Sequence, residues 1–372
     1  MMFKQLSVKY RPRYFQDVDG QQVSVQIMKN SILMDRVAKA MILSGIRGTG
    51  KTTLARIYAK ALNCEKFESL GDVCNECTSC LEADNGTHPD IIEFDAASNN
   101  GVDFVRDLEV TFRQVETFKR RVIIFDEVHM FTSQAQSALL KTLEEPPRNL
   151  TFILSTTDPE KLEDTIRSRC LSMPLKPLAP VDIAQNLRRL IQAEGRVADE
   201  SFIQSLSMYG GGSLRDVQQI LDQLILVAGD ECLTDKHLEE SLGIISSSTY
   251  RTLAPILCSV DLKVALDWVE HWYQNGVDLE QLYLEGIPNL LRDFTVVLSG
   301  SWSPQVALLS GIPAEVIQEK VPLSLEYIKY ISTQWEHHRE LMKTMSLPKV
   351  VWTMFFVSIF KQASTASCLP DY

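Results

Sequence analysis

"GIRGTGKTT", residues 45–53, fits the pattern G-x-x-x-x-G-K-[ST], with Gly45, Gly50, Lys51 and Thr52 at the fixed positions. It follows an apolar run and opens a helical pattern, which is the context that a phosphate-binding loop requires. Glycines let backbone N–H groups turn toward phosphates, and a helix N-terminus adds a favourable potential. The alternative is a glycine turn with an incidental lysine. The residues expected around a bound nucleotide are Gly45, Ile46, Arg47, Gly48, Thr49, Gly50, Lys51, Thr52 and Thr53.

Four short apolar runs alternate with helical stretches around this loop, as in βα units with a parallel sheet. The runs are "AMILS" (40–44), "DIIEF" (90–94), "RVIIF" (121–125) and "TFILS" (151–155). The sequence therefore predicts an α/β P-loop domain with a parallel sheet and flanking helices. Ligands collect at the carboxyl ends of parallel strands, so one edge is expected to gather Lys51, Asp126, Glu127 and Thr157. A capping box of Ser133 and Gln136 is expected to begin the helix after the third run.

"VIIFDEVHM" places Asp126 and Glu127 directly after a buried strand. In a P-loop ATPase the two acids of such a pair have different roles. Asp126, together with Thr52, would organise Mg²⁺, and Glu127 would accept a proton from the attacking water. The alternative is a solvated acidic turn. His129, two residues further on, receives no role from the sequence.

Beyond the sheet, "MPLKPLAP" (173–180) is interpreted as a linker, and the remaining chain has helical patterns at 181–194, 199–209, 213–228 and about 248–365. "GGG" (210–212) is expected to separate two of these helices. We predict a helical lid domain and an all-α C-terminal domain after the α/β domain. The predicted boundaries are 1–178 for the α/β domain, 179–242 for the lid and 243–368 for the C-terminal collar or oligomerisation domain.

Four cysteines follow the phosphate-loop helix at the spacing C-x9-C-x2-C-x2-C: Cys64, Cys74, Cys77 and Cys80. Four thiolates can close a tetrahedron around Zn²⁺, which is typical of a structural site rather than a catalytic one. A Cys-x-x-Cys redox pair is the rival interpretation, but it leaves two of the cysteines unexplained. His88 is a possible substitute ligand. The other cysteines are scattered and are interpreted as small apolar residues.

The chain has 372 residues, of which 45% are hydrophobic and 23% are charged, and a net charge of −11. This composition is that of a globular protein of two or three domains. Residues 1–178 carry 23 Lys and Arg against 24 Asp and Glu, whereas residues 179–372 carry 14 against 24. Because contacts to phosphates need Lys and Arg, any nucleic-acid contact is expected in the first half. The sequence shows no signal peptide or membrane span, so a cytoplasmic location with reduced thiols is expected.

The order of these motifs resembles that of the AAA+ ATPases of sliding-clamp loaders, and most closely the gamma/tau subunit family of bacterial DNA polymerase III. The resemblance is dense over residues 5–230 and thin afterwards. Besides the phosphate loop and "DEVH", it is carried by "KYRPRYFQDVDGQQ" (9–22), "HPDIIEFDAASNNGVDFVRDL" (88–108), "SALLKTLEEPP" (137–147), "LSTTDPEKLEDTIRSRC" (154–170) and "GGSLRD" (211–216).

The resemblance implies roles for individual residues. Thr157 matches the sensor at the end of the fourth strand, and Arg215 matches a lid-borne sensor that contacts the γ-phosphate. Arg169 matches the arginine finger, which reaches the ATP of a neighbouring subunit. For both arginines the alternative is a structural salt bridge. Four residues are expected near the base and ribose: Tyr10, Arg11, Pro12 and Val18.

The resemblance further implies an ATP hydrolase that, with ATP and Mg²⁺, opens a sliding clamp and loads it onto primer-template DNA. The expected assembly is a hetero-pentamer with delta and delta-prime type subunits, in the bacterial replisome and without contact with a membrane. Because the chain ends at "STASCLPDY" (364–372), we expect a short form from which polymerase tethering is not inferred. Two alternatives are a nucleotide-binding scaffold without turnover and a different AAA+ DNA-remodelling motor.

Overall fold

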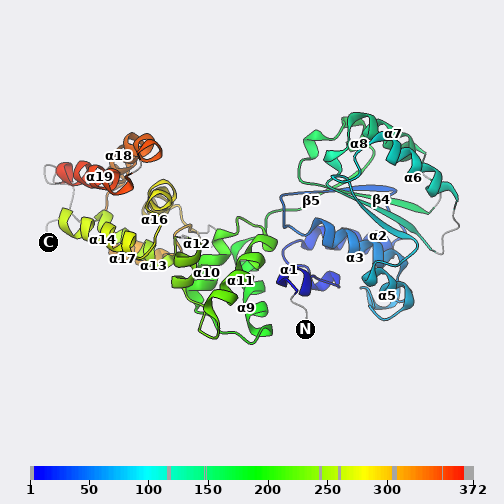
Figure 1. Cartoon of the computed structure of the whole chain (residues 1–372), viewed down its shortest axis with the longest axis horizontal. Coiled ribbons are helices and arrows are strands. Elements are labelled where there is room, and N and C mark those ends of the chain that lie inside the picture. The colour runs from blue at the N-terminus through cyan, green and yellow to red at the C-terminus, as the bar shows by residue number, and fades with distance from the viewer. Residues whose placement is uncertain are drawn as a thin grey trace. The chain divides into compact units, whose positions relative to one another are not determined.

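The computed structural model describes residues 4–114, 119–145, 147, 149–242, 245–258, 261–303, 308–345 and 347–363. The chain divides into two compact units (Figure 1). The first comprises residues 1–186 with 210–219, and the second comprises residues 187–209 with 220–372. The three-part division at 178 and 242 stays a prediction, and Cys368 lies outside the described residues.

The first unit is built on five parallel strands in the order β2-β3-β4-β1-β5. The central strands are buried on both faces, which is why they read as continuous apolar runs rather than as alternating patterns. The strands are β1 (Ala40–Ser44), β2 (Ile91–Asp95), β3 (Arg121–Asp126), β4 (Leu150–Thr156) and β5 (Leu171–Pro174).

Helices cover both faces of this sheet, as Figure 1 shows. On one face α2 (Gln22–Leu33) and α3 (Lys51–Asn63) pack on Met41, Leu43 and Ile124. On the other face α6 (Val102–Gln114) and α7 (Ser133–Glu144) contribute to a core with Phe125 and Phe152. The short elements of this part are α1 (Leu6–Lys9), η1 (Phe15–Asp17), α4 (Phe67–Leu70), α5 (Thr78–Asn85), η2 (Val128–Met130), η3 (Pro159–Lys161) and α8 (Asp164–Arg167).

Two local expectations are wrong. The segment 173–180 is not wholly a linker, because Met173 and Pro174 end β5, which pairs with β1. The capping box predicts Ser133 as the N-cap of α7, but the N-cap lies one residue earlier. Thr132 is its N-cap and accepts a hydrogen bond from Ala135 N–H, whereas Ser133 is its first helical residue. Gln136 instead donates to the carbonyls of Phe131 and Lys161.

The described residues after β5 form helices joined by loops, and "GGG" separates α10 from α11. The prediction of a parallel sheet with flanking helices followed by a helical region is therefore confirmed. The helices are α9 (Pro180–Ala193), α10 (Glu200–Tyr209), α11 (Leu214–Ala228), α12 (Asp235–Leu242), α13 (Ser247–Cys258), α14 (Leu262–Gln274), α15 (Leu279–Gln281), η4 (Leu282–Gly286), α16 (Ile287–Leu298), α17 (Ala314–Lys320), α18 (Leu325–Thr344) and α19 (Pro348–Ala363).

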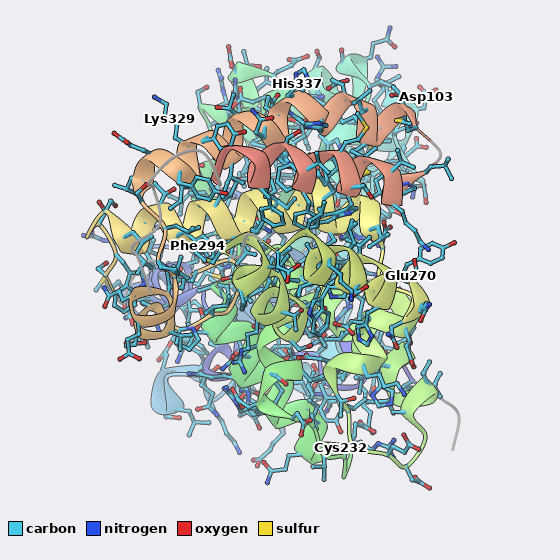
Figure 2. The ribbon with its side chains drawn as sticks, turned by 90° about the vertical axis from the view of Figure 1, so that its left-hand side faces the viewer. Asp103, Cys232, Glu270, Phe294, Lys329 and His337 are labelled. Carbon is cyan, nitrogen blue, oxygen red and sulfur yellow. The ribbon has the colours of Figure 1, made fainter. Side chains whose placement is uncertain are left out.

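Helices α13 to α19 of the second unit share one apolar core. It contains Trp272 on α14, Phe294 on α16, and Trp352 and Phe355 on α19. Phe294 is fully buried, whereas Glu270 and His337 are exposed (Figure 2). Among the helices described, none combines the length and apolar character needed to cross a membrane.

Candidate nucleotide-binding site

The phosphate loop joins β1 to α3 in a conformation that its glycines make possible. Gly48 has φ +80°, and a Cβ at this position would lie 2.1 Å from Ser213 Oγ. Gly50 is the N-cap of α3 and has φ 98°. These backbone angles are rarely adopted by residues with a side chain, so glycine is needed at both positions. The loop therefore reaches the N-terminus of α3 with its backbone N–H groups available for an anion.

Lys51 is the first residue of α3 and is 6% exposed. Its Nζ donates to the carbonyls of Gly45 and Ile46, at 2.8 and 3.0 Å. Burial lowers the pKa of Lys51, while the carboxylates of Glu127 and Asp126 act in the opposite direction. The ammonium group of Lys51 thus lies inside the loop that would surround a bound phosphate.

Thr52 and Asp126 bring two oxygen ligands together at the same edge of the sheet. Thr52 Oγ1 donates to Asp126 Oδ2 at 2.8 Å. Burial raises the pKa of Asp126, and nearby Glu127 raises it further. Hydroxyl and carboxylate oxygens are ligands that Mg²⁺ prefers, so the pair fits a magnesium site beside the phosphate loop.

Glu127 follows Asp126 in the left-handed conformation, with φ 50°. Its Oε2 accepts hydrogen bonds from Thr157 N–H at 3.3 Å and from Thr157 Oγ1 at 3.1 Å. Thr157 directly follows β4, which lies beside β3 in the sheet. The structure therefore joins the acid after β3 to the threonine after β4.

A pocket surrounds this edge of the sheet, and all of its lining belongs to the first unit. It contains every residue expected near the base and ribose, together with Arg215. Arg11 lies near Arg56 and Arg215, and burial followed by the charge of Arg56 lowers its pKa. The lining residues are Ser7, Tyr10, Arg11, Pro12, Val18, Asp19, Arg47, Gly48, Thr49, Gly50, Lys51, Thr52, Thr53, Asp126, Glu127, Leu178, Asn186, Leu214, Arg215 and Gln218.

Some residues of this pocket have no signal in the sequence. Asn186 donates to Asp19 Oδ2 at 2.8 Å and accepts from Gln218 at 3.0 Å. Outside the pocket lining, Gln21 donates to Lys176 O at 2.7 Å, which ties the N-terminal segment to the chain after β5. These partners are more than thirty residues apart, and only the fold brings them together.

Arg169 does not line the pocket. It is exposed, and its guanidinium pairs with Glu144 at 2.8 Å and donates to Thr165 O at 2.8 Å. Within one chain Arg169 therefore forms a surface ion pair, which is the alternative to a role as an arginine finger.

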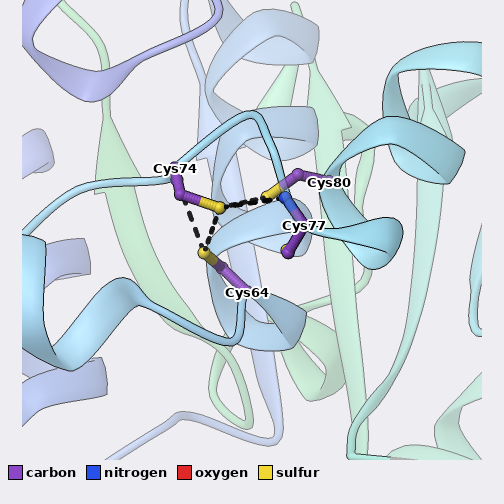
Figure 3. A group of neighbouring side chains, drawn as sticks. All are labelled: Cys64, Cys74, Cys77 and Cys80. Carbon is purple, nitrogen blue, oxygen red and sulfur yellow. Dashed lines mark hydrogen bonds between the residues drawn. The ribbon is translucent and has the colours of Figure 1, made fainter.

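The four cysteines lie together and are buried (Figure 3). All four sulfur atoms are within 4.8 Å of one another, with 3.6 Å between Cys64 and Cys74 and 3.8 Å between Cys74 and Cys80. A tetrahedron with Zn–S bonds of about 2.3 Å has S–S edges of about 3.8 Å, whereas a disulfide needs about 2.05 Å. The four-thiol cluster thus has the donor type and spacing of a structural zinc site.

Backbone N–H groups point at these sulfur atoms. Cys74 N–H donates to Cys64 Sγ at 3.4 Å, and Glu76 and Cys77 N–H donate to Cys74 Sγ at 3.5 and 3.3 Å. Burial by itself raises the pKa of Cys74, but these donors and the neighbouring thiols lower it to about 6. The local backbone therefore favours the thiolate at Cys74, whereas burial raises the pKa of Cys64 and Cys80.

His88 is not part of the cysteine cluster. Its Nδ1 accepts a hydrogen bond from Asp90 N–H at 3.0 Å, and its Nε2 lies 3.0 Å from Ser79 Oγ. Both ring nitrogens are therefore engaged elsewhere, which removes His88 as a substitute ligand.

Comparison with known proteins gives consistent results. A family model described as "DNA polymerase III, delta subunit" matches residues 20–179. The gamma subunit of DNA polymerase III from Buchnera aphidicola subsp. Baizongia pistaciae is 35% identical over 298 residues, which cover 80% of each chain. The tau subunits of Bacillus subtilis and Escherichia coli are 34% and 35% identical and match 100% and 80% of this chain.

The matched regions make up only 66% and 46% of those two tau subunits. Among solved structures, the RuvB Holliday junction branch migration motor of Thermotoga maritima aligns with 18% identity and a TM-score of 0.45, covering 84% of this chain and 88% of that one. Because the match to the gamma subunit extends over four fifths of both proteins, this chain belongs to the gamma/tau subunit family of DNA polymerase III.

Proposed function

We propose that this chain is an ATP-hydrolysing motor subunit of a clamp loader, in which ATP drives the opening of a sliding clamp and its loading onto primed DNA. The observation that carries this proposal is the cluster at the edge of the sheet. Thr52 bonds to Asp126 beside Lys51, and Glu127 bonds to Thr157. This combination supplies charge, metal ligands and a base within one pocket, as phosphoryl transfer requires.

Each residue of the cluster would have its own role in the reaction. Lys51 and the loop N–H groups would bind the β- and γ-phosphates, and Thr52 and Asp126 would hold Mg²⁺, which offsets negative charge on the phosphates when bound. Glu127 would take a proton from the attacking water while the oxygen of that water bonds to the γ-phosphorus. The bond from that phosphorus to the leaving β-phosphate oxygen breaks, giving ADP and phosphate.

Seven further residues complete the proposed machinery. Thr157 would hold Glu127 and orient the water, and Arg215, which lines the same pocket, would contact the γ-phosphate within the chain. Arg169 would act on ATP bound to the adjacent subunit. Tyr10, Arg11, Pro12 and Val18 would surround the base and ribose.

The proposed assembly follows from the family. We propose a hetero-pentamer with delta and delta-prime type subunits that acts on a sliding clamp and primer-template DNA in the bacterial cytoplasm. The second half of the chain is acidic, so DNA contacts are assigned to the first half. We also propose that Cys64, Cys74, Cys77 and Cys80 hold a structural Zn²⁺, which would fix the fold of the segment after α3.

Glu127→Gln tests whether the chain is a motor or a scaffold. Because the amide cannot accept the proton, hydrolysis by the assembled complex should fall about 10²–10⁴-fold, whereas ATP affinity should stay unchanged. Single-turnover hydrolysis and binding of a fluorescent ATP analogue measure the two effects separately. Glu145→Gln, which changes an exposed acid of the same unit, is the matched control.

The rival functions predict other results. A scaffold subunit would bind ATP without turnover in the wild type as well. A different DNA-remodelling motor would hydrolyse ATP without a response to the clamp and would displace strands by itself. A rise in the ATPase rate when clamp and primer-template are added together is the result expected for a clamp loader.

A further inference from the structure

His129 lies next to the proposed base although no role has been assigned to it. The left-handed residue Glu127 begins a tight turn, in which Met130 N–H donates to Glu127 O at 2.9 Å. This turn brings His129 Nδ1 to 3.3 Å from Glu127 Oε2 and to 3.1 Å from Thr156 Oγ1. The histidine side chain is 11% exposed, so its ring is held in place.

The contact between His129 and Glu127 favours one position for the ring proton. A carboxylate only accepts hydrogen bonds, so the contact is favourable only when Nδ1 of the ring carries the hydrogen. Thr156 Oγ1 already accepts from Asp158 N–H at 3.0 Å and can share the Nδ1 proton. The carboxylate of Glu127 therefore favours a ring that is protonated at Nδ1.

Two hydrogen bonds from Thr157 and the close approach of His129 converge on the same oxygen of Glu127. Oε2 accepts hydrogen bonds from Thr157 N–H and Thr157 Oγ1–H and lies 3.3 Å from His129 Nδ1, whereas among the described residues no contact involves Oε1. The Glu127 side chain is 35% exposed, so its rotation is limited by these hydrogen bonds rather than by burial. Holding Oε2 in this way leaves Oε1 as the oxygen that can accept a proton from water.

We infer that His129 is a positioning residue that, together with Thr157, holds Oε2 of Glu127 and so orients the base for the attacking water. This inference rests on the proposed function, in which Glu127 is the base. His129 itself need not touch the nucleotide, because it lies outside the pocket lining.

Three substitutions at this position separate the hydrogen bond from the bulk of the ring. His129→Ala removes the donor, His129→Asn places an amide nitrogen as far along the side chain as Nδ1, and His129→Gln places one further out, near the position of Nε2. In the assembled complex with clamp and primer-template, the alanine variant should lower kcat on the order of ten-fold with KM unchanged, because the base is then misplaced. Asparagine should restore most of the rate and glutamine should not.

Two controls distinguish positioning from a structural role. His337→Ala, which removes an exposed histidine of α18 (Figure 2), should leave kcat unchanged. In the Glu127→Gln background His129→Ala should have no further effect, because the two residues act through one oxygen. Equal losses for the asparagine and alanine variants, or an additive loss in the double variant, would overturn the inference.

A measurement independent of turnover tests the contact itself. Nitrogen chemical shifts of ¹⁵N-labelled histidine in the full chain, assigned with His129→Ala, should show His129 protonated at Nδ1. A ring protonated at Nε2 alone overturns the inference even if hydrolysis is normal. If the wild type shows no turnover, the proposed function fails, and the chemical shifts still decide whether His129 carries the Nδ1 proton that the inference requires.

Discussion

Replacing Arg169 with alanine should lower ATP hydrolysis by the assembled complex about 10³–10⁵-fold while sparing the binding of nucleotide. An arginine that reaches the γ-phosphoryl group of a neighbouring subunit stabilises the charge that develops there during transfer. The residue lies outside the pocket of its own chain, so its removal should leave ATP affinity unchanged. Single-turnover hydrolysis and equilibrium binding of ATP, both with clamp and primer-template, measure the two parts of this prediction.

The geometry of Arg169 is compatible with movement to a partner. Its ion pair with Glu144 is between side chains that are 38% and 47% exposed. Pairs of this kind contribute about 0–1 kcal/mol, so a phosphate can compete for the guanidinium group at little cost. Lysine at this position should restore only part of the rate, because it lacks the planar set of donors that matches phosphate oxygens.

Arg167→Ala is the matched control for this prediction. Arg167 lies two residues away and pairs with Glu160 and Asp164 of its own chain. Its removal should leave hydrolysis unchanged. Normal hydrolysis by the Arg169 variant in the presence of clamp and primed DNA, or full activity of the dilute wild-type chain alone, would contradict a role between subunits.

Of the four strands that the sequence identifies, three are buried on both faces, whereas β2 lies at an edge of the sheet and is only partly buried. β1, β3 and β4 are continuous apolar runs because helices cover both sides of them. β5 was missed because three of its four residues are exposed and it ends at Pro174. Such a strand belongs to the edge of a sheet, where apolar patterns are weak and proline is tolerated.

In the candidate site, too, some residues could be predicted from the sequence and others could not. The phosphate loop and the acidic pair are local patterns, and their spacing alone indicates their chemistry. Hydrogen bonds such as that from Asn186 to Asp19 depend on the path of the chain between them. His129 follows Glu127 by two residues in the sequence, but its contact with Thr156 appears only when β3 and β4 are placed side by side.

Replacing Cys80 with serine should abolish zinc binding and destabilise the first unit. Cys80 is fully buried in the core that also holds Leu54 and Tyr58 of α3. Loss of a structural metal typically costs more than about 4 kcal/mol, which corresponds to a fall of roughly 10 °C in melting temperature for a unit of this size. Metal content by atomic absorption and thermal unfolding followed by circular dichroism measure both effects.

The loss of zinc should also weaken the nucleotide site, because the helix α3 joins the four cysteines to the phosphate loop. α3 begins at Lys51 and ends at Asn63, next to Cys64. Lys60 of the same helix is buried and binds Asp84 at 2.7 Å. We therefore expect weaker ATP binding in Cys80→Ser, whereas Cys232→Ser, which changes a cysteine outside the cluster, should keep zinc, melting temperature and affinity. A Cys80→Ser protein with full zinc content and unchanged melting would show that the four thiols do not hold a structural metal.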